Sequence, residues 1–164
     1  MKVCLGQINT TPGDFPGNLL GIENGIKTAS SQKADLVVFP ELTITGYLSQ
    51  DLLYDKDYID AALNSLKKVE HFSSESDPNL YIVLGNVARN PGRRKPFRNN
   101  ALVINKGEVI GEYTKQLLPF YDVFDELRYF QPGTDLLCFK VKNKRIGVVI
   151  CEDLWNDKDS DDYE

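Results

Sequence analysis

Three residues that can take part in covalent chemistry each stand where a predicted strand ends. They are Glu41 after residues 34–39, Lys115 after residues 108–114 and Cys151 after residues 145–150. A thiol at a rigid strand end is well placed to act as a nucleophile, and a nearby carboxylate can take its proton as a general base. An ammonium group and the backbone N–H that follows the thiol can stabilise an oxyanion. Together the three residue types predict acyl transfer through a thioester.

Taken singly, each of these residues has a plainer interpretation. Cysteine is often a small buried hydrophobic residue, which would make Cys151 part of the core. Glu41 could simply face water in the loop after its strand, and Lys115 could be a solvated loop lysine. The occurrence of all three at strand ends, where sites gather in α/β sheets, favours the catalytic interpretation. In a folded chain we expect the carboxylate, the ammonium and the thiol to lie within about 3–5 Å of one another.

The elements that would position these residues follow from hydrophobic spacing. Residues 2–9 and 34–39 indicate two strands joined by a helix that starts near Asn18, which predicts a parallel βαβ unit. The spacing further predicts helices at 57–72 and 126–130, and strands at 80–87, 98–104, 108–114, 136–141 and 145–150. The last four strands form two antiparallel hairpins, and the apolar run 148–150 suits a strand buried on both faces. The predicted class is α/β.

Composition sets limits on the function. The 164 residues are 41% hydrophobic and 26% charged, which is typical of one globular domain. A net charge of −5 and a pI near 5.0 argue against nucleic acid or an anionic membrane as partner. No apolar run approaches the roughly 20 residues of a membrane span, and the first residues do not form a signal peptide. We therefore expect a soluble cytoplasmic protein.

Cysteine and histidine usage narrows the chemistry. Cys4, Cys138 and Cys151 are odd in number and lack C-x-x-C spacing, so neither a disulfide framework nor a metal site is expected. The single histidine, His71, follows an amphipathic helix and is interpreted as a surface residue, so any base for Cys151 must be another group. Cys4 is expected to be a buried strand residue that reacts more slowly with thiol reagents than Cys151. The acidic tail 156–164 is expected to be disordered.

Three segments resemble the signature segments of a known superfamily. Residues 39–42 (Phe-Pro-Glu-Leu), 113–115 (Tyr-Thr-Lys) and 150–153 (Ile-Cys-Glu-Asp) resemble those of the nitrilase, or carbon–nitrogen hydrolase, superfamily. Longer stretches at 40–47 and 115–130, together with Cys-Glu-Asp-Leu-Trp at 151–155, resemble the glutaminase domains of glutamine-dependent NAD+ synthetases. The resemblance implies an α-β-β-α sandwich, of which this chain would form a part.

The same resemblance implies roles for individual residues. Glu41 would be the general base, Lys115 the residue that stabilises the oxyanion and Cys151 the nucleophile. Glu126 resembles a second, supporting glutamate of the family. Glu152, which follows the nucleophile, is taken as a further supporting residue.

The resemblance also implies a substrate. Tyr121 resembles a position that contacts glutamine, so the partner of the site would be glutamine or another small amide. Ammonia would pass to a separate synthetase domain that makes NAD+ from deamidated NAD.

Family glutaminase domains continue for about 100 residues beyond the nucleophile, the size of a second small domain. Residues 1–164 would therefore be the N-terminal portion of a glutaminase domain, with the synthetase domain absent. ATP and magnesium would belong to that absent domain, so no cofactor is expected in this chain. The 164 residues alone are expected to show little or no glutaminase activity and no NAD+ synthesis.

Uncovered apolar surface would favour self-association or a homo-oligomer. Two alternatives stay open for the function. One is a nitrilase-type amidase acting on another small amide, and the other is a non-catalytic fragment that associates with a full-length relative.

Overall fold

The computed structural model describes residues 1–155, and its elements follow the predicted order. The elements are β1 (Val3–Leu5), α1 (Phe15–Ser31), β2 (Leu36–Val38), the 3₁₀ helix η1 (Gln50–Tyr54), α2 (Lys56–Ser74), β3 (Tyr81–Arg89), β4 (Phe97–Asn105), β5 (Glu108–Thr114), α3 (Glu126–Tyr129), β6 (Leu137–Val141), β7 (Lys144–Val148) and the 3₁₀ helix η2 (Cys151–Leu154). The expectation for the tail 156–164 lies outside the described residues. No helix within residues 1–155 is long and apolar enough to cross a membrane.

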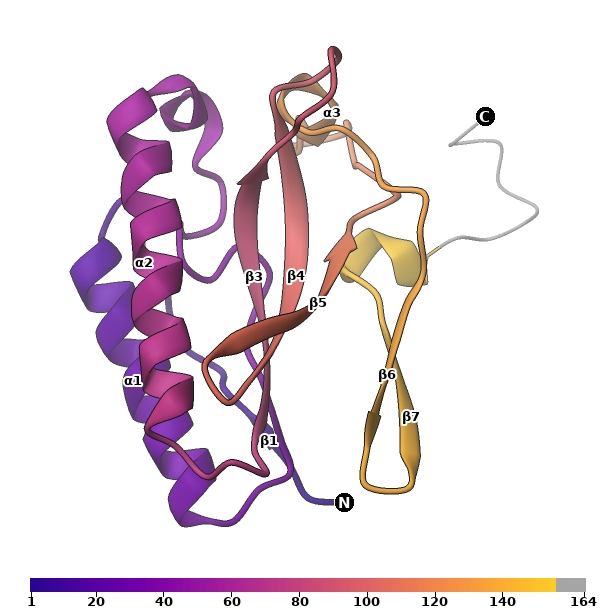
Figure 1. The fold of residues 1–164 in the computed structure, drawn as a ribbon. Coiled ribbons are helices and arrows are strands. Elements are labelled where there is room, and N and C mark those ends of the chain that lie inside the picture. The colour runs from indigo at the N-terminus through magenta and orange to yellow at the C-terminus, as the bar shows by residue number, and fades with distance from the viewer. Residues whose placement is uncertain (156–164) are drawn as a thin grey trace.

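Five strands form one sheet in the order β1-β2-β3-β4-β5 (Figure 1). The pairs β1–β2 and β2–β3 are parallel, which confirms the predicted βαβ unit. The pairs β3–β4 and β4–β5 are antiparallel, and β6 and β7 form a separate antiparallel hairpin. Both predicted hairpins are therefore present. Glu41 follows β2, which is parallel to its neighbours, and Lys115 follows β5, which is antiparallel to β4.

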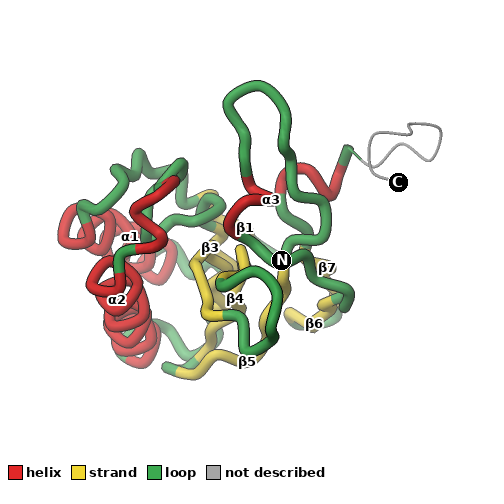
Figure 2. Tube along the Cα trace, turned by 90° about the horizontal axis from the view of Figure 1, so that it is seen from above, coloured by secondary structure: helices red, strands yellow, loops and turns green. Residues whose placement is uncertain are grey.

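Helices α1 and α2 cover one face of this sheet, as Figures 1 and 2 show. Helix α1 begins after Asp14, whose side chain accepts a hydrogen bond from the backbone N–H of Gly17 at 3.0 Å, the usual arrangement of an N-cap. Apolar residues at helical spacing then face the sheet. The main hydrophobic core combines these helix residues with one face of the strands; it includes Leu19, Ile22, Ile26, Ile59, Val69, Val37, Ile82, Leu84, Leu102 and Ile104.

The β6–β7 hairpin packs on the opposite face of the five-stranded sheet. A second apolar cluster forms there from alternate residues of β2 to β5 together with the end of the hairpin: Leu36, Val83, Ala101, Val103, Tyr113, Val148 and Ile150. In Figure 2 the helices lie on one side of the sheet and the hairpin on the other. The described residues thus stack as a helical layer, a main sheet and a second β-layer. This arrangement confirms the predicted α/β class and the partial sandwich.

The structure corrects the expectation that residues 148–150 form a strand buried on both faces. Strand β7 ends at Val148, and the side chain of Val149 is 47% exposed whereas Val148 and Ile150 are buried. The reason is that β7 belongs to a hairpin with one face on the main sheet, so only every second residue is buried. The first strand is also shorter than predicted, and Cys4 within it is half-buried rather than buried.

Candidate active site

Lys115 lies between two carboxylates. Its side chain is fully buried, and its Nζ donates a hydrogen bond to Oε1 of Glu41 at 2.8 Å and to Oε1 of Glu126 at 2.9 Å. Glu41 follows β2, Lys115 follows β5 and Glu126 opens α3, so three separate segments meet at one ammonium group. The structure therefore brings two of the three predicted catalytic residues, and the predicted supporting glutamate, into direct contact.

Backbone contacts fix the positions of these side chains. The N–H of Lys115 donates to the carbonyl of Asn99 at 2.9 Å, and the carbonyl of Lys115 accepts from the N–H of Gly133 at 2.9 Å. The loop that carries Glu41 lies directly against β3 at Gly85, whose N–H donates to the carbonyl of Pro40 at 3.2 Å. A Cβ at Gly85 would lie only 2.2 Å from the backbone nitrogen of Leu42, so this close approach requires glycine.

Two further residues hold the carboxylates, and no role was predicted for either of them from the sequence. The Nδ2 of Asn99 donates to Oε1 of Glu41 at 2.6 Å and lies 3.5 Å from Oε2 of Glu126. The hydroxyl of Tyr47 donates to Oε1 of Glu126 at 3.0 Å. Asn99 is fully buried in β4, and a polar residue inside a predicted apolar strand was the available signal for it. Tyr47 stood within the segment 40–47 that carries the family resemblance.

Burial and charge together set the protonation of this cluster. Burial acts to lower the pKa of Lys115, but the charges of Glu41 and Glu126 outweigh it and hold the pKa above its ordinary value. Lys115 is therefore a permanent cation. Burial raises the pKa of Glu126, and the charge of Lys115 offsets part of that rise. Burial and the charges of Glu126 and Glu41 raise the pKa of Tyr47, so its hydroxyl keeps its proton and acts as a donor.

Cys151 opens the 3₁₀ helix η2, three residues after the end of β7. Its φ of +44° lies in the left-handed region, which is uncommon for a residue with a side chain. Cys151 and Glu41 line the same cavity of about 120 Å³, with the ends of β2 and β7 and the middle of β3 among its other walls. Burial and the charge of Glu41 raise the pKa of the Cys151 thiol, and Lys115 acts against them. The resting group is accordingly a thiol that needs a base.

Tyr121 and Glu152 contact each other beside the nucleophile. The hydroxyl of Tyr121 donates to both carboxylate oxygens of Glu152, at 2.9 and 3.0 Å. This hydrogen bond and burial raise the pKa of Tyr121. The ring of Tyr121 is half-exposed and packs edge-on against Phe124 at 5.7 Å between centroids. Glu152 itself is buried, so the pair joins the residue after Cys151 to the more exposed ring of Tyr121. That Tyr121 contacts a substrate stays a prediction.

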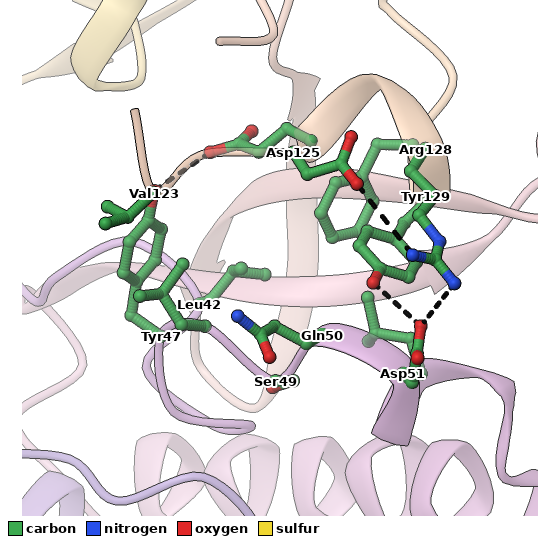
Figure 3. A pocket seen from close by; sticks show the side chains of 13 residues that line it. Leu42, Tyr47, Ser49, Gln50, Asp51, Val123, Asp125, Arg128 and Tyr129 are labelled. Carbon is green, nitrogen blue, oxygen red and sulfur yellow. Dashed lines mark hydrogen bonds and ion pairs between the residues drawn. The ribbon is translucent and has the colours of Figure 1, made fainter. Parts of the chain in front are cut away.

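A second, larger cavity of about 200 Å³ is lined in part by Glu126 (Figure 3). Its walls come from residues 47–51 and from the segment 123–130. Across it, the hydroxyl of Tyr129 donates to Asp51 at 2.8 Å, and Arg128 forms an ion pair with the same carboxylate at 3.0 Å. Cys151 does not line this cavity. We therefore place the reaction at the smaller cavity, which Cys151 and Glu41 line.

His71 lies on the surface of α2, as predicted. Its side chain is 65% exposed and stands 3.5 Å from the carboxylate of Glu75. Within residues 1–155, no group of three or more His, Cys, Asp or Glu side chains has an arrangement that could hold a metal ion.

The family model described as carbon-nitrogen hydrolase matches residues 2–160, nearly the whole chain. The chain belongs to the carbon–nitrogen hydrolase family. The predicted superfamily is thereby confirmed.

Two relatives with similar sequences are both glutamine-dependent NAD(+) synthetases. The glutamine-dependent NAD(+) synthetase of Thermotoga maritima is 37% identical over 156 residues, which cover 95% of this chain and 26% of the relative. The relative of the same name from Synechocystis sp. is 36% identical over 161 residues, which cover 95% of this chain and 28% of the relative. The chain thus spans about a quarter of the length of these relatives.

Solved structures agree with the fold. The glutamine-dependent NAD+ synthetase of Acinetobacter baumannii matches 93% of this chain and 28% of its own, with a TM-score of 0.81 and 35% identity. An amidase of the nitrilase superfamily from Nesterenkonia matches 95% of this chain and 57% of its own, with a TM-score of 0.82. At 21% identity the amidase supports the fold alone.

Proposed function

We propose that residues 1–164 are the N-terminal portion of a glutaminase domain. This domain would release ammonia from glutamine through a thioester at Cys151, and the ammonia would serve the amidation of deamidated NAD. The observation that carries the proposal is the buried ammonium of Lys115, bonded to Glu41 and Glu126 beside the cavity that Cys151 lines. The identity of 37% to a glutamine-dependent NAD(+) synthetase supports glutamine as the substrate.

The geometry suits a sequence of proton and acyl transfers. Oε1 of Glu41 already accepts from Lys115 and Asn99, whereas Oε2 accepts no hydrogen bond within residues 1–155 and is available for the thiol proton. The sulfur would then attack the amide carbon, and the proton held by Glu41 would pass to the departing ammonia. Water would then attack the resulting thioester while Glu41 takes a proton from it. The C–S bond would break and Glu41 would return the proton to the sulfur, which leaves glutamate and the free thiol.

Lys115 can stabilise the oxyanion without leaving its carboxylates. An ammonium group has three N–H donors, and two of them are directed at Glu41 and Glu126. The third has no partner among residues 1–155 and would donate to the substrate oxygen, with the backbone N–H that follows Cys151 as the second donor. None of these steps uses a cofactor, and we assign ATP and magnesium to the synthetase reaction. We place the whole reaction in the cytoplasm.

A hybrid enzyme tests this function. In the hybrid, this chain replaces the matching segment of the Thermotoga maritima relative, and ammonia release from glutamine is measured against release from short aliphatic amides. We expect glutamine to be the preferred substrate. Hydrolysis of the short amides alone would instead favour a nitrilase-type amidase. A folded hybrid that hydrolyses neither, and in which Cys151 forms no acyl adduct, would favour a non-catalytic associating fragment.

We further propose that the isolated chain associates with a second copy of itself. Strand β1 is an edge of the main sheet, and its Val3 and Leu5 side chains are 44% and 75% exposed. Exposed apolar residues on a free strand edge favour pairing between chains. Sedimentation of the 164-residue chain should therefore show a mass that rises with concentration.

Leu5→Lys should shift this association toward monomer. Leu20→Lys is the matched control, because Leu20 is 59% exposed but lies on α1. A wild-type chain that stays monomeric at all concentrations would contradict the proposal, as would an equal effect of the two variants.

A further inference from the structure

The carboxylate of Asp153 gathers four hydrogen bonds from two distant segments. Its Oδ1 accepts from the backbone N–H of Gln116 at 3.1 Å and from that of Leu117 at 2.9 Å. Its Oδ2 accepts from the backbone N–H of Ile150 at 2.9 Å and from the hydroxyl of Tyr113 at 2.7 Å. Three of the donors are backbone N–H groups and the fourth is the hydroxyl of the buried Tyr113 ring, so the position of each donor is fixed by the fold.

These four donors flank two of the three predicted catalytic residues. Tyr113 and Gln116 stand on either side of Lys115 in the chain, and Ile150 directly precedes Cys151. The Asp153 side chain forms no hydrogen bond to the Cys151 thiol or to Nζ of Lys115 within the described residues. It therefore joins the backbone that carries the thiol to the backbone that carries the ammonium, without contacting either reacting group.

The backbone at Cys151 needs such support. A φ of +44° is disfavoured for a residue with a side chain and persists only where surrounding contacts enforce it. Two hydrogen bonds join Asp153 to Ile150 across this turn. The N–H of Asp153 donates to the carbonyl of Ile150 at 3.0 Å, and the N–H of Ile150 donates to the carboxylate of Asp153. The same carboxylate then anchors the turn to the segment after β5.

Only a carboxylate can satisfy all four donors. An aspartate has two oxygens that each accept two hydrogen bonds, whereas an asparagine has one oxygen and an NH2 group. In Asp153→Asn the oxygen could keep the N–H groups of Gln116 and Leu117, and the hydroxyl of Tyr113 could turn to accept from the NH2. The N–H of Ile150 would then face another donor, so the contact nearest to Cys151 would be lost.

We propose that Asp153 is a positioning residue that holds the Cys151 turn against the Lys115 segment. The inference rests on the proposed function only in taking Cys151 as the nucleophile. Because it concerns the position of the thiol, it can be tested without glutamine hydrolysis. Failure of the hybrid enzyme to release ammonia would therefore leave this test intact.

The pH profile of Cys151 alkylation reports on its position. The charged groups that act on the thiol are Glu41, Lys115, Glu126 and Glu152, and the hydroxyls of Tyr47 and Tyr121 interact with it as well. In the native turn, burial and Glu41 hold the thiol pKa above its ordinary value. If Asp153 no longer holds the turn, the thiol of Cys151, which is already exposed, should move away from Glu41. The midpoint of its alkylation should then fall.

The experiment follows iodoacetamide labelling of the full 164-residue chain against pH, with peptide mapping by mass spectrometry. Exposed Cys138 in β6 is the internal control, since its extent of labelling should be the same in every variant. We expect Asp153→Ala to lower the Cys151 midpoint by about half a pH unit or more. At a pH below the midpoint, this corresponds to about three times as much thiolate. Asp153→Asn should give a smaller fall, and Tyr113→Phe, which removes one donor of four, the smallest.

Asp35→Asn separates positioning from general loss of stability. Asp35 also binds several donors, the backbone N–H of Lys2 at 2.7 Å and Nζ of Lys142 at 2.7 Å, but it precedes β2 at the far end of the strand from Glu41. Its replacement should lower the thermal midpoint and leave Cys151 labelling unchanged. If Asp153→Ala does not fold, the other two variants test the proposal: the Cys151 midpoint should fall more in Asp153→Asn than in Tyr113→Phe. A Cys151 midpoint that is unchanged or raised in the folded Asp153 variants overturns the proposal.

Discussion

Replacing Cys151 by alanine is expected to lower glutamine hydrolysis by the hybrid enzyme about ten-thousandfold or more, because a covalent pathway loses its nucleophile. The remaining donors, Lys115 and the backbone of η2, could still polarise an amide but would have no thiol to deliver to it. The fold should be unaffected, since Cys151 is exposed and makes no hydrogen bond through its side chain within residues 1–155. Ammonia release at saturating glutamine measures the effect.

Cys138→Ala is the matched control for this variant. Cys138 is also exposed and also free, but it lies in β6, away from the cavity that Glu41 lines. Its replacement should change the hydrolysis rate less than twofold or so, as expected of a surface substitution away from the site. A Cys151→Ala hybrid that loses no more than the twofold or so expected of Cys138→Ala would show that the reaction does not depend on Cys151, and the thioester mechanism would then be wrong.

Lys115→Met is expected to destabilise the fold by about 3–5 kcal/mol near neutral pH, because it leaves two buried carboxylates without their cation. Methionine fills a similar volume, so the loss of charge dominates over the loss of packing. Glu41 and Glu126 would then face each other across the space that Nζ occupies, where they now lie 2.8 and 2.9 Å from it. Urea unfolding followed by circular dichroism measures the difference.

The pH dependence of this loss has a definite sign. The pKa of Glu126 is already raised by burial, and Lys115 acts to lower it, so removing Lys115 raises it further. A carboxyl group with a pKa above its unfolded value favours the folded state at low pH, and this stability is lost as the pH rises through the folded pKa. The deficit of Lys115→Met should therefore be smaller at about pH 5 than at about pH 8.

Lys142→Met is the control for an ion pair in a different environment. Nζ of Lys142 lies 2.7 Å from a carboxylate oxygen of Asp35, but the side chain is 63% exposed. Asp35 is buried but also accepts the N–H of Lys2, and the Lys142 end of the pair lies in solvent, so the loss should be smaller and almost independent of pH across that range. Equal losses for Lys115→Met and Lys142→Met would contradict the buried cluster.

Much of the fold could be predicted from the sequence because its signals are local. Helical spacing of apolar residues identified α1 and α2, and turn residues between apolar runs identified the β4–β5 and β6–β7 hairpins. Burial of individual residues was less predictable. Val149 belongs to an apolar run, yet it is exposed because β7 packs through one face only.

The sequence by itself determined that Glu41, Lys115 and Cys151 each follow a strand within three residues of its end, because a strand and the turn after it depend on local residues. The tertiary structure alone decided what those side chains contact. Asn99 reaches Glu41 from 58 positions away, and Asp153 reaches the N–H of Leu117 from 36. Such contacts depend on strand register and on how the layers pack, and no local pattern encodes either.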